Sequence, residues 1–157
     1  MDEIIEKYAD MVYRLALIHM GNDKQSADDV FQDVFLVLIK KNMTFNEEEH
    51  CKAWLINVTL NLCKKHHFKR KDILMEEKDI NKVREEEIVS DTDVRSSRIY
   101  ECVCKLPEKY KTVIDLFYFE DFSTKQIAKI LRISEATVRK RLSRARDYLK
   151  NDMEELV

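Results

Sequence analysis

Turn-forming residues are almost absent from this sequence, which has one glycine and one proline in 157 residues. Sheets and barrels need many tight turns, and glycine and proline supply most of them. The scarcity of both residues therefore argues against a β architecture. With 45% hydrophobic and 37% charged residues, the composition instead predicts an all-α fold.

Long apolar runs and an export signal are missing as well. No stretch approaches the roughly 20 apolar residues of a membrane span, and the N-terminus, MDEIIEKYAD, is acidic rather than a secretory signal. The spacing of the cysteines matches no common zinc site, so we expect reduced thiols, no metal and no cofactor. These cysteines are Cys51, Cys63, Cys102 and Cys104. The sequence predicts a cytoplasmic protein that does not insert into membranes.

The charges are unevenly distributed, although the net charge is only −2. Acidic residues dominate from Asp72 to Val94, where apolar residues are sparse and aromatic residues are absent. Such a composition is typical of a flexible linker. We expect an acidic flexible linker over residues 72–97 that joins two small helical domains, residues 1–71 and 98–157. Fully extended, such a linker reaches at most roughly 90 Å.

The stretch from Phe122 to Lys150 has the pattern of a helix-turn-helix. Its apolar residues recur at helical spacing on both sides of a short break. They are Ile127, Ala128, Leu131, Ile133, Val138, Leu142, Ala145 and Leu149. Ser134 stands at the expected N-cap of the second helix. Arg132 stands at the turn, where glycine is common, and a left-handed conformation there costs about 1 kcal/mol.

Basic residues cover the outward side of the second helix in this stretch. Arg139, Lys140 and Ser143 point away from its apolar stripe, and Arg144 and Arg146 flank the stripe. Arginine and lysine side chains on such a face fit the major groove of DNA. A solvated amphipathic helix is the plainer interpretation, but the turn before it favours a DNA-reading role.

The N-terminal half predicts three helices, over residues 3–20, 26–41 and 51–69. The second helix is expected to begin at Ser26, with Asp28 and Asp29 in its first turn. The third ends in a run of basic residues with an interleaved aromatic, KKHHFKRK. Such a run exceeds what a helix dipole needs and favours a nucleic-acid surface. His19 lies on an apolar face, where we expect a packing role.

Two sets of motifs resemble the extracytoplasmic-function (ECF) sigma factors of bacterial RNA polymerase. The block LPEKYKTVIDLFYFEDFSTKQIAKILRISEATVRKRLSRARDYLK is similar to the family's sigma-4 domain. The segments YADMVYRLAL, SADDVFQDVFLVLIKK and AWLINVTLNLCKKHHFKRK are similar to its sigma-2 domain. Together they cover about four-fifths of the chain. The resemblance implies a non-enzymatic initiation factor that binds core RNA polymerase, directs it to promoter DNA and promotes local melting.

The resemblance also implies roles for individual residues. It assigns polymerase binding to Asp29, Gln32, Asp33 and Phe35. It assigns binding of the single-stranded minus-ten element to Phe45, Asn61, Lys64, Lys65, Lys69 and Arg70. For the minus-thirty-five element, it places Arg139, Lys140 and Ser143 at base edges and Arg144 and Arg146 near phosphates. Family members are commonly held by an anti-sigma factor, although no residue here identifies one.

Two alternatives come from other classes of protein. A stand-alone helix-turn-helix regulator would bind palindromic DNA as a dimer without polymerase. An enzyme acting on nucleic acid would need a phosphate-binding loop or a placed catalytic pair, and the sequence offers neither. The lysines and histidines after Asn61 differ from the arginine-rich run often found in the family. His66 and His67 raise the hypothesis that pH modulates melting, because histidine changes charge near neutral pH.

Overall fold

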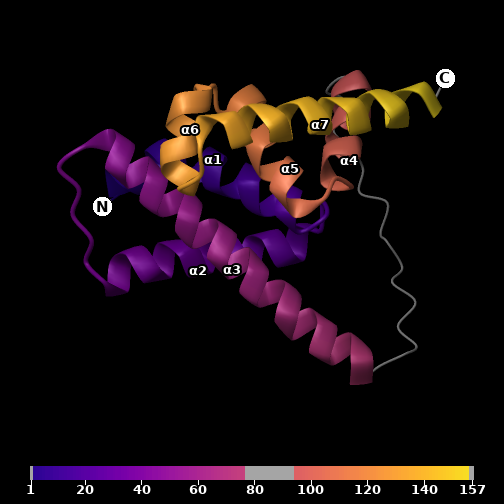
Figure 1. Ribbon diagram of the computed structural model, residues 1–157. Coiled ribbons are helices and arrows are strands. Elements are labelled where there is room, and N and C mark those ends of the chain that lie inside the picture. Colours follow the sequence, from indigo (N-terminus) through magenta and orange to yellow (C-terminus); the bar gives the residue numbers. More distant parts are fainter. Residues whose placement is uncertain (1, 77–93, 156–157) are drawn as a thin grey trace.

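The computed structural model describes residues 2–76 and 94–155, and the side chains of residues 2–69 and 98–152. Every regular element in these ranges is helical (Figure 1). The N-terminal domain contains α1 (Asp2–His19), α2 (Lys24–Lys40) and α3 (Glu48–Glu76). The C-terminal domain contains α4 (Val94–Cys104), α5 (Glu108–Ile114), the π-helical η1 (Asp115–Phe119), α6 (Thr124–Leu131) and α7 (Glu135–Glu155). The predicted all-α fold is confirmed.

Helices α1, α2 and α3 pack against one another around a common core. Leu15, Val34 and Leu55, one from each helix, are fully buried. The first helix ends where the sequence predicts, since Gly21 and Asn22 both have left-handed φ angles of 63° and 66°. Glycine and asparagine adopt this conformation more easily than other residues.

The start of α2 differs from the prediction. The helix begins at Lys24, and the residue at the N-cap position is Asp23 rather than Ser26. Ser26 is buried inside the first turn, where its hydroxyl donates a hydrogen bond to Asp23 Oδ2 (2.8 Å). Asp28 and Asp29 consequently lie beyond the first turn. Aspartate is as common as serine at N-cap positions, although the Asp23 side chain makes no capping hydrogen bond to the α2 backbone.

Helices also extend into both ends of the predicted linker. Helix α3 continues to Glu76 and α4 begins at Val94. The third helix thus runs well beyond the predicted 51–69. Leucine, methionine and glutamate in the segment DILME are good helix formers, so its acidic composition did not indicate flexibility. The remaining linker positions, 77–93, lie outside the described residues.

The C-terminal domain follows its local sequence signals closely. Pro107 separates α4 from α5. Ser123 and Gln126 form a capping box at the start of α6, with hydrogen bonds of 2.9 and 3.1 Å. Arg132 ends α6 in the left-handed conformation (φ 58°, ψ 43°), as its position in the turn predicts. The helix-turn-helix is therefore formed by α6 and α7.

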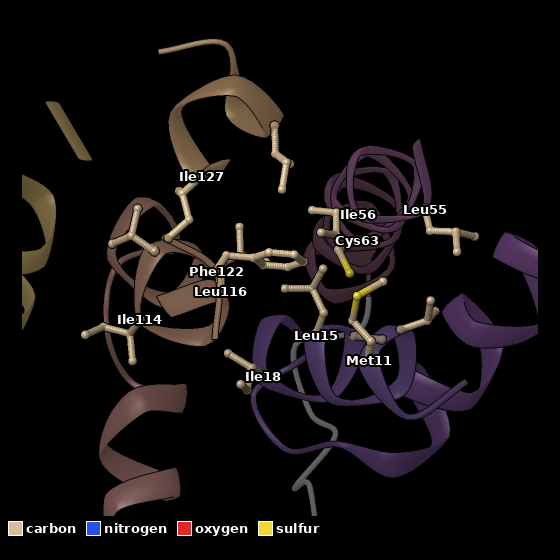
Figure 2. Close-up of a cluster of buried hydrophobic side chains, with 14 of the residues drawn as sticks. Met11, Leu15, Ile18, Leu55, Ile56, Cys63, Ile114, Leu116, Phe122 and Ile127 are labelled. Atoms are coloured by element: carbon tan, nitrogen blue, oxygen red, sulfur yellow. The ribbon is translucent and has the colours of Figure 1, made fainter. Parts of the chain in front are cut away.

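The two domains lie directly against each other. Helix α1 contacts α4 and α5, and α3 contacts α6. In Figure 2, Leu116 and Phe122 of the C-terminal domain lie toward Leu15 of α1 and Ile56 of α3, and all four side chains are buried. The apolar core is thus continuous across the domain boundary. The sequence predicts two tethered domains and gives no sign of this contact.

Candidate nucleic-acid interface

Helix α7 is held by one buried face and presents the opposite face to solvent. Val138, Leu142 and Ala145 are buried against the C-terminal domain. Ser134 caps the helix, since its Oγ accepts a hydrogen bond from the Thr137 main-chain N–H (3.1 Å). The predicted DNA-contacting residues all lie exposed: Arg139, Lys140, Ser143, Arg144 and Arg146. The helix therefore displays a basic, solvent-facing surface on a fixed support.

A neighbouring acid lies beside the first arginine of this surface. Glu135 Oε1 is 4.0 Å from Arg139 Nη1 and accepts a hydrogen bond from Thr124 Oγ1 (3.0 Å). Thr124 belongs to α6, so this bond ties the beginnings of the two helices together. The contact with Arg139 is long and exposed, so it leaves the guanidinium free to bind other groups.

Arg146 differs from the other basic residues of α7, because it is already engaged within the domain. Its Nε donates a hydrogen bond to Tyr118 Oη (2.7 Å). Its guanidinium carbon lies 5.9 and 5.7 Å from the ring centroids of Phe117 and Tyr118. These are cation–π distances. Arg146 therefore attaches α7 to η1, which the sequence pattern did not indicate.

A second basic surface lies on the C-terminal half of α3. Asn61, Lys64, Lys65 and Lys69 are all exposed, as predicted, and Phe68 beside them is 70% exposed. We call these five residues the α3 basic surface. The side chain of Arg70 lies outside the described residues. The sequence had already shown an aromatic among the basic residues, but only the structure shows how far Phe68 projects into solvent.

Phe45 lies before α3 and is partly buried. Its ring is 5.7 Å from the ring of Trp54 and 5.6 Å from that of His50, measured between centroids. Trp54 is half-buried against the domain core. Phe45 is thus part of an aromatic cluster at the beginning of α3, and Trp54 in this cluster is about two helical turns before Asn61, where the α3 basic surface begins.

The two adjacent histidines of α3 do not belong to this surface equally. His67 Nε2 donates a hydrogen bond to the main-chain oxygen of His19 (2.7 Å), which turns the ring back toward α1. His66 is half-exposed. Of the two, His67 therefore has a role in packing α3 against α1.

Helix α2 contains all the residues predicted to bind polymerase and exposes all of them but one. Asp29, Gln32 and Asp33 are exposed. Phe35 is buried in the core and lies 4.9 Å from Phe31, between ring centroids, so its side chain is not at the surface. Leu36 and Ile39 are instead exposed, at 47% and 49%. We call Asp29, Gln32, Asp33, Leu36 and Ile39 the α2 outer face.

The sequence held a signal for the apolar part of this face. Leu36 and Ile39 are three residues apart, and Leu36 lies one turn after Gln32 and Asp33. The core stripe of α2 already accounts for an amphipathic helix, so the sequence alone does not single out these two residues. Exposed leucine and isoleucine next to one another often mark a site of contact with another protein.

The remaining reactive groups are withdrawn from solvent. All four cysteines are buried and free. Burial raises the pKa of Cys63 to about 12 and that of Cys104 to about 11. Such thiols stay protonated and unreactive at neutral pH. No cluster of three or more potential ligands suited to a metal ion occurs among the described residues. None of the described helices has both the length and the apolar character needed to cross a membrane.

These features define a two-domain helical protein with a helix-turn-helix and two separate basic surfaces. Comparison with known families identifies it further. Residues 4–73 match the family model of Sigma-70 region 2, and residues 96–149 match that of Sigma-70, region 4. The chain belongs to the ECF sigma factors of RNA polymerase, a non-enzymatic family that directs the polymerase to promoters.

Individual relatives agree with this assignment. The ECF RNA polymerase sigma factor SigW of Bacillus subtilis (strain 168) is 27% identical over 98% of this chain and 89% of its own length. RNA polymerase sigma factor SigV of the same organism is 30% identical over 85% of this chain and 78% of its own. Sigma factor RpoE from Bartonella quintana, solved in complex with the anti-sigma factor NepR, has the same fold. Its TM-score is 0.71 at 18% identity, covering 98% of both chains.

Proposed function

We propose that this sigma factor opens promoters by dividing the work among three surfaces. The α2 outer face binds core polymerase, the α3 basic surface holds a melted strand of the minus-ten element, and α7 reads the minus-thirty-five element as duplex. Melting of this kind needs no covalent chemistry. It needs an unpaired strand to be bound more strongly than the duplex holds it. The chain would act in the cytoplasm, where core polymerase is found.

The assignment of α7 rests on its rigidity and its exposed cations. A helix in the major groove reads sequence only if its side chains keep a fixed relation to the groove. Burial of Val138 and Leu142 and the cap at Ser134 fix the helix. Arg139, Lys140 and Ser143 are assigned to base edges, and Arg144 to phosphate. Arg146 is also assigned to phosphate, although its Nε already donates a hydrogen bond to Tyr118 Oη.

The assignment of the α3 basic surface rests on Phe68 and its neighbours. Single-stranded DNA is bound by cations that follow the backbone and by aromatic rings on which bases stack. Phe68 supplies a free ring, and Lys64, Lys65 and Lys69 supply the charges. Stacking contributes about 1–3 kcal/mol per base. Asn61 and the partly buried Phe45 remain our candidates for holding a flipped base, with Arg70 as a further cation.

The assignment of the α2 outer face rests on its mixed chemistry. Asp29 and Asp33 provide charge that steers a partner and fixes the register of binding. Leu36 and Ile39 provide apolar area that becomes buried in a complex. Phe35, which lies in the core, stabilises the helix rather than touching polymerase. An anti-sigma factor would inhibit the chain by covering this same face.

The observation that carries the proposal is that two different basic surfaces lie on two domains, one on a helix fixed by its buried face and its cap, the other with an exposed aromatic ring. The test is transcription by purified bacterial core polymerase from a promoter library. Leu36→Asp together with Ile39→Asp should abolish core binding and transcription while leaving the fold intact, because both side chains are exposed. Glu6→Gln, on the exposed side of α1, is the matched control.

The result that would overturn the proposal is equally definite. Normal transcription by the Leu36→Asp, Ile39→Asp variant would remove the α2 outer face from polymerase binding. Failure of the unaltered chain to start RNA synthesis on every template would reject the proposed function. Dimeric binding to palindromic DNA without polymerase would support the stand-alone regulator instead.

A further inference from the structure

An acidic side chain lies at the beginning of the otherwise basic helix α7. Glu135 and Asp147 are the only acidic residues between Phe122 and Lys150, where nine lysines and arginines occur. Glu135 is the first residue of α7, and its side chain is 42% exposed. A carboxylate at this place repels the phosphates that the surrounding cations attract. Its position in the DNA-reading helix therefore does not serve general affinity for DNA.

The position of this carboxylate is fixed by a hydrogen bond from the neighbouring helix. Thr124, the first residue of α6, donates from Oγ1 to Glu135 Oε1 over a distance of 3.0 Å. The main chain is held as well, because Ser134 caps α7 immediately before Glu135. Helix α6 in turn packs against α7. The carboxylate of Glu135 is therefore held in a defined place relative to the rest of the helix-turn-helix.

The same carboxylate lies beside an arginine that is assigned to a base edge. Glu135 Oε1 is 4.0 Å from Arg139 Nη1, one turn further along the helix, and the arginine side chain is 63% exposed. Among the described residues, both side-chain contacts of Glu135 use Oε1. Oε2 can therefore accept a further hydrogen bond. The beginning of α7 thus presents a strong acceptor next to a strong donor.

Neighbouring base pairs can offer the complementary pattern in the major groove. Guanine exposes two acceptors, O6 and N7, which an arginine binds together, and cytosine exposes a donor, the N4 amino group, which a carboxylate accepts. Successive bases are about 3.4 Å apart along the helix axis, close to the 4.0 Å between Glu135 Oε1 and Arg139 Nη1. The first residues of a reader helix are also those that contact base edges. The two side chains therefore suit a guanine and a cytosine in adjacent base pairs.

A purely structural role for Glu135 is the plainer alternative. An acid in the first turn of a helix interacts favourably with the helix dipole, and the hydrogen bond from Thr124 ties α6 to α7. These roles need one carboxylate oxygen and a negative charge, and they predict no effect on which DNA sequence is bound. Measuring sequence preference rather than stability therefore separates a structural role from base reading.

We propose that Glu135 is a specificity-determining residue, which accepts a hydrogen bond from a cytosine N4 amino group in the base pair next to the guanine bound by Arg139. The inference rests on the proposed function, since it takes α7 as the reader of the duplex at the minus-thirty-five element. Thr124 is a positioning residue, because it acts on the DNA only through Glu135. Where no cytosine is present, the carboxylate has no partner and repels the backbone, so other sequences are bound more weakly.

The test is selection from duplexes randomised over the minus-thirty-five element, by the full-length chain in complex with bacterial core polymerase. The unaltered complex should favour a guanine and a cytosine in two adjacent base pairs. Glu135→Gln should replace the cytosine preference by one for adenine, because glutamine binds adenine N6 and N7. Glu135→Ala should reduce discrimination at this base pair by about 5-fold, the lower end of the range for base contacts. The guanine preference should persist in both variants.

Matched variants separate base reading from charge and from folding. Asp147→Asn removes the same charge from an exposed position of α7 and should strengthen binding to all sequences evenly. Arg139→Ala should relax the guanine preference alone. Thr124→Val should weaken the cytosine preference, whereas Thr124→Ser keeps the hydroxyl and should retain it. Circular dichroism should show the same helix content in every variant, since all these side chains are exposed or half-buried.

Three results would overturn the inference and leave the proposed function intact. They are an unaltered complex that selects guanine without an adjacent cytosine, a Glu135→Gln complex that changes affinity evenly as Asp147→Asn does, and loss of the guanine preference instead of the cytosine preference in Glu135→Ala. The last result would show that Glu135 acts only through Arg139. An unaltered complex that starts transcription but has no sequence preference at the upstream element would reject the role of α7 itself, and this inference with it.

Discussion

The two basic surfaces are built in different ways. Helix α7 is capped by Ser134, tied to α6 through Thr124 and Glu135, and attached to η1 through Arg146. The α3 basic surface lies toward the projecting end of a long helix (Figure 1), where Phe68 has most of its ring in solvent. A helix that reads duplex DNA must hold its side chains still. A surface that captures a flexible strand instead gains from exposed rings and mobile lysines.

The largest expected difference between the two surfaces is in how much a substitution changes the free energy of unfolding. Leu142→Ala shortens a side chain on the buried face of α7 and should lower the free energy of unfolding by about 2–5 kcal/mol. Phe68→Ala removes an exposed ring and should change it by less than about 0.5 kcal/mol. Urea denaturation followed by circular dichroism measures both. Equal losses would mean that the α3 basic surface is packed after all.

The next effect distinguishes the surfaces by the form of DNA, single-stranded or duplex, that each is proposed to bind. In the polymerase complex, Phe68→Ala should weaken binding to a single-stranded minus-ten oligonucleotide by about 1–3 kcal/mol, with duplex binding unchanged. Phe68→Trp, which keeps a stacking ring, is the control. A Phe68→Ala complex that binds the oligonucleotide normally would remove Phe68 from the proposal.

A matching effect is expected on the duplex side. Arg139→Ala should cost about 1–3 kcal/mol at a promoter and relax the preference at one base pair. Lys150→Ala, further along the same helix, should weaken binding evenly across sequences. Competition binding of the polymerase complex to promoter variants measures both. The base-reading role of Arg139 fails if the two variants lose the same amount on every sequence.

Two side chains of the C-terminal domain, Tyr100 and Asp115, have buried polar atoms without a hydrogen-bond partner among the described residues, and only Asp115 is an acid. Asp115 in η1 is fully buried, and neither carboxylate oxygen has a hydrogen-bond partner among the described residues. Burial raises the pKa of Asp115 well above its ordinary value, with the charge of Glu120 acting in the same direction and that of Arg14 against it. The folded chain therefore holds a proton that the unfolded chain releases, so stability falls as pH rises above the ordinary carboxyl pKa.

Asp115→Leu should remove this pH dependence. At pH 7 the variant should be more stable by about 1–3 kcal/mol, the usual cost of an unsatisfied buried polar group, and its advantage should shrink toward pH 4. Thermal unfolding across this pH range measures it. Asp147→Asn, an exposed acid on α7, should show no such trend, and a constant gain for Asp115→Leu would contradict the assignment.

The smallest effect concerns the turn before α7. Arg132→Gly should stabilise the fold by up to about 1 kcal/mol, since Arg132 has a φ of 58° that glycine adopts without strain. Differential scanning calorimetry can detect the shift. A destabilised Arg132→Gly chain would show that the arginine side chain contributes more than its backbone costs.

Local signals in the sequence were sufficient for the helix-turn-helix. Apolar spacing, the cap at Ser134 and the left-handed Arg132 all act within a few residues, so the sequence alone indicates them. Contacts between distant residues could not be predicted in this way. His19 pairs with Glu108, and Arg146 with Tyr118. Both pairs depend on how the helices pack, and no sequence motif indicates either pair.

The predicted site residues show the same division. Exposure of the lysines on α3 and of the arginines on α7 follows from helical periodicity. Helical periodicity places Phe35 on the core face of α2, where it is found, whereas the family resemblance assigns it a polymerase contact by position alone. The ends of the linker were missed because acidic composition and helix propensity gave opposite indications for residues 72–76.

The length of α3 has a consequence for how far the domains can move apart. Its 29 residues form a rod roughly 44 Å long, and residues 77–93 can add at most about 60 Å of chain. Because α3 is packed in the N-terminal domain as far as Cys63, only its C-terminal part could extend the linker as a stiff arm in the proposed promoter complex. If the proposed function holds, shortening this C-terminal part of α3 by one or two turns should alter the preferred spacer length between the two promoter elements.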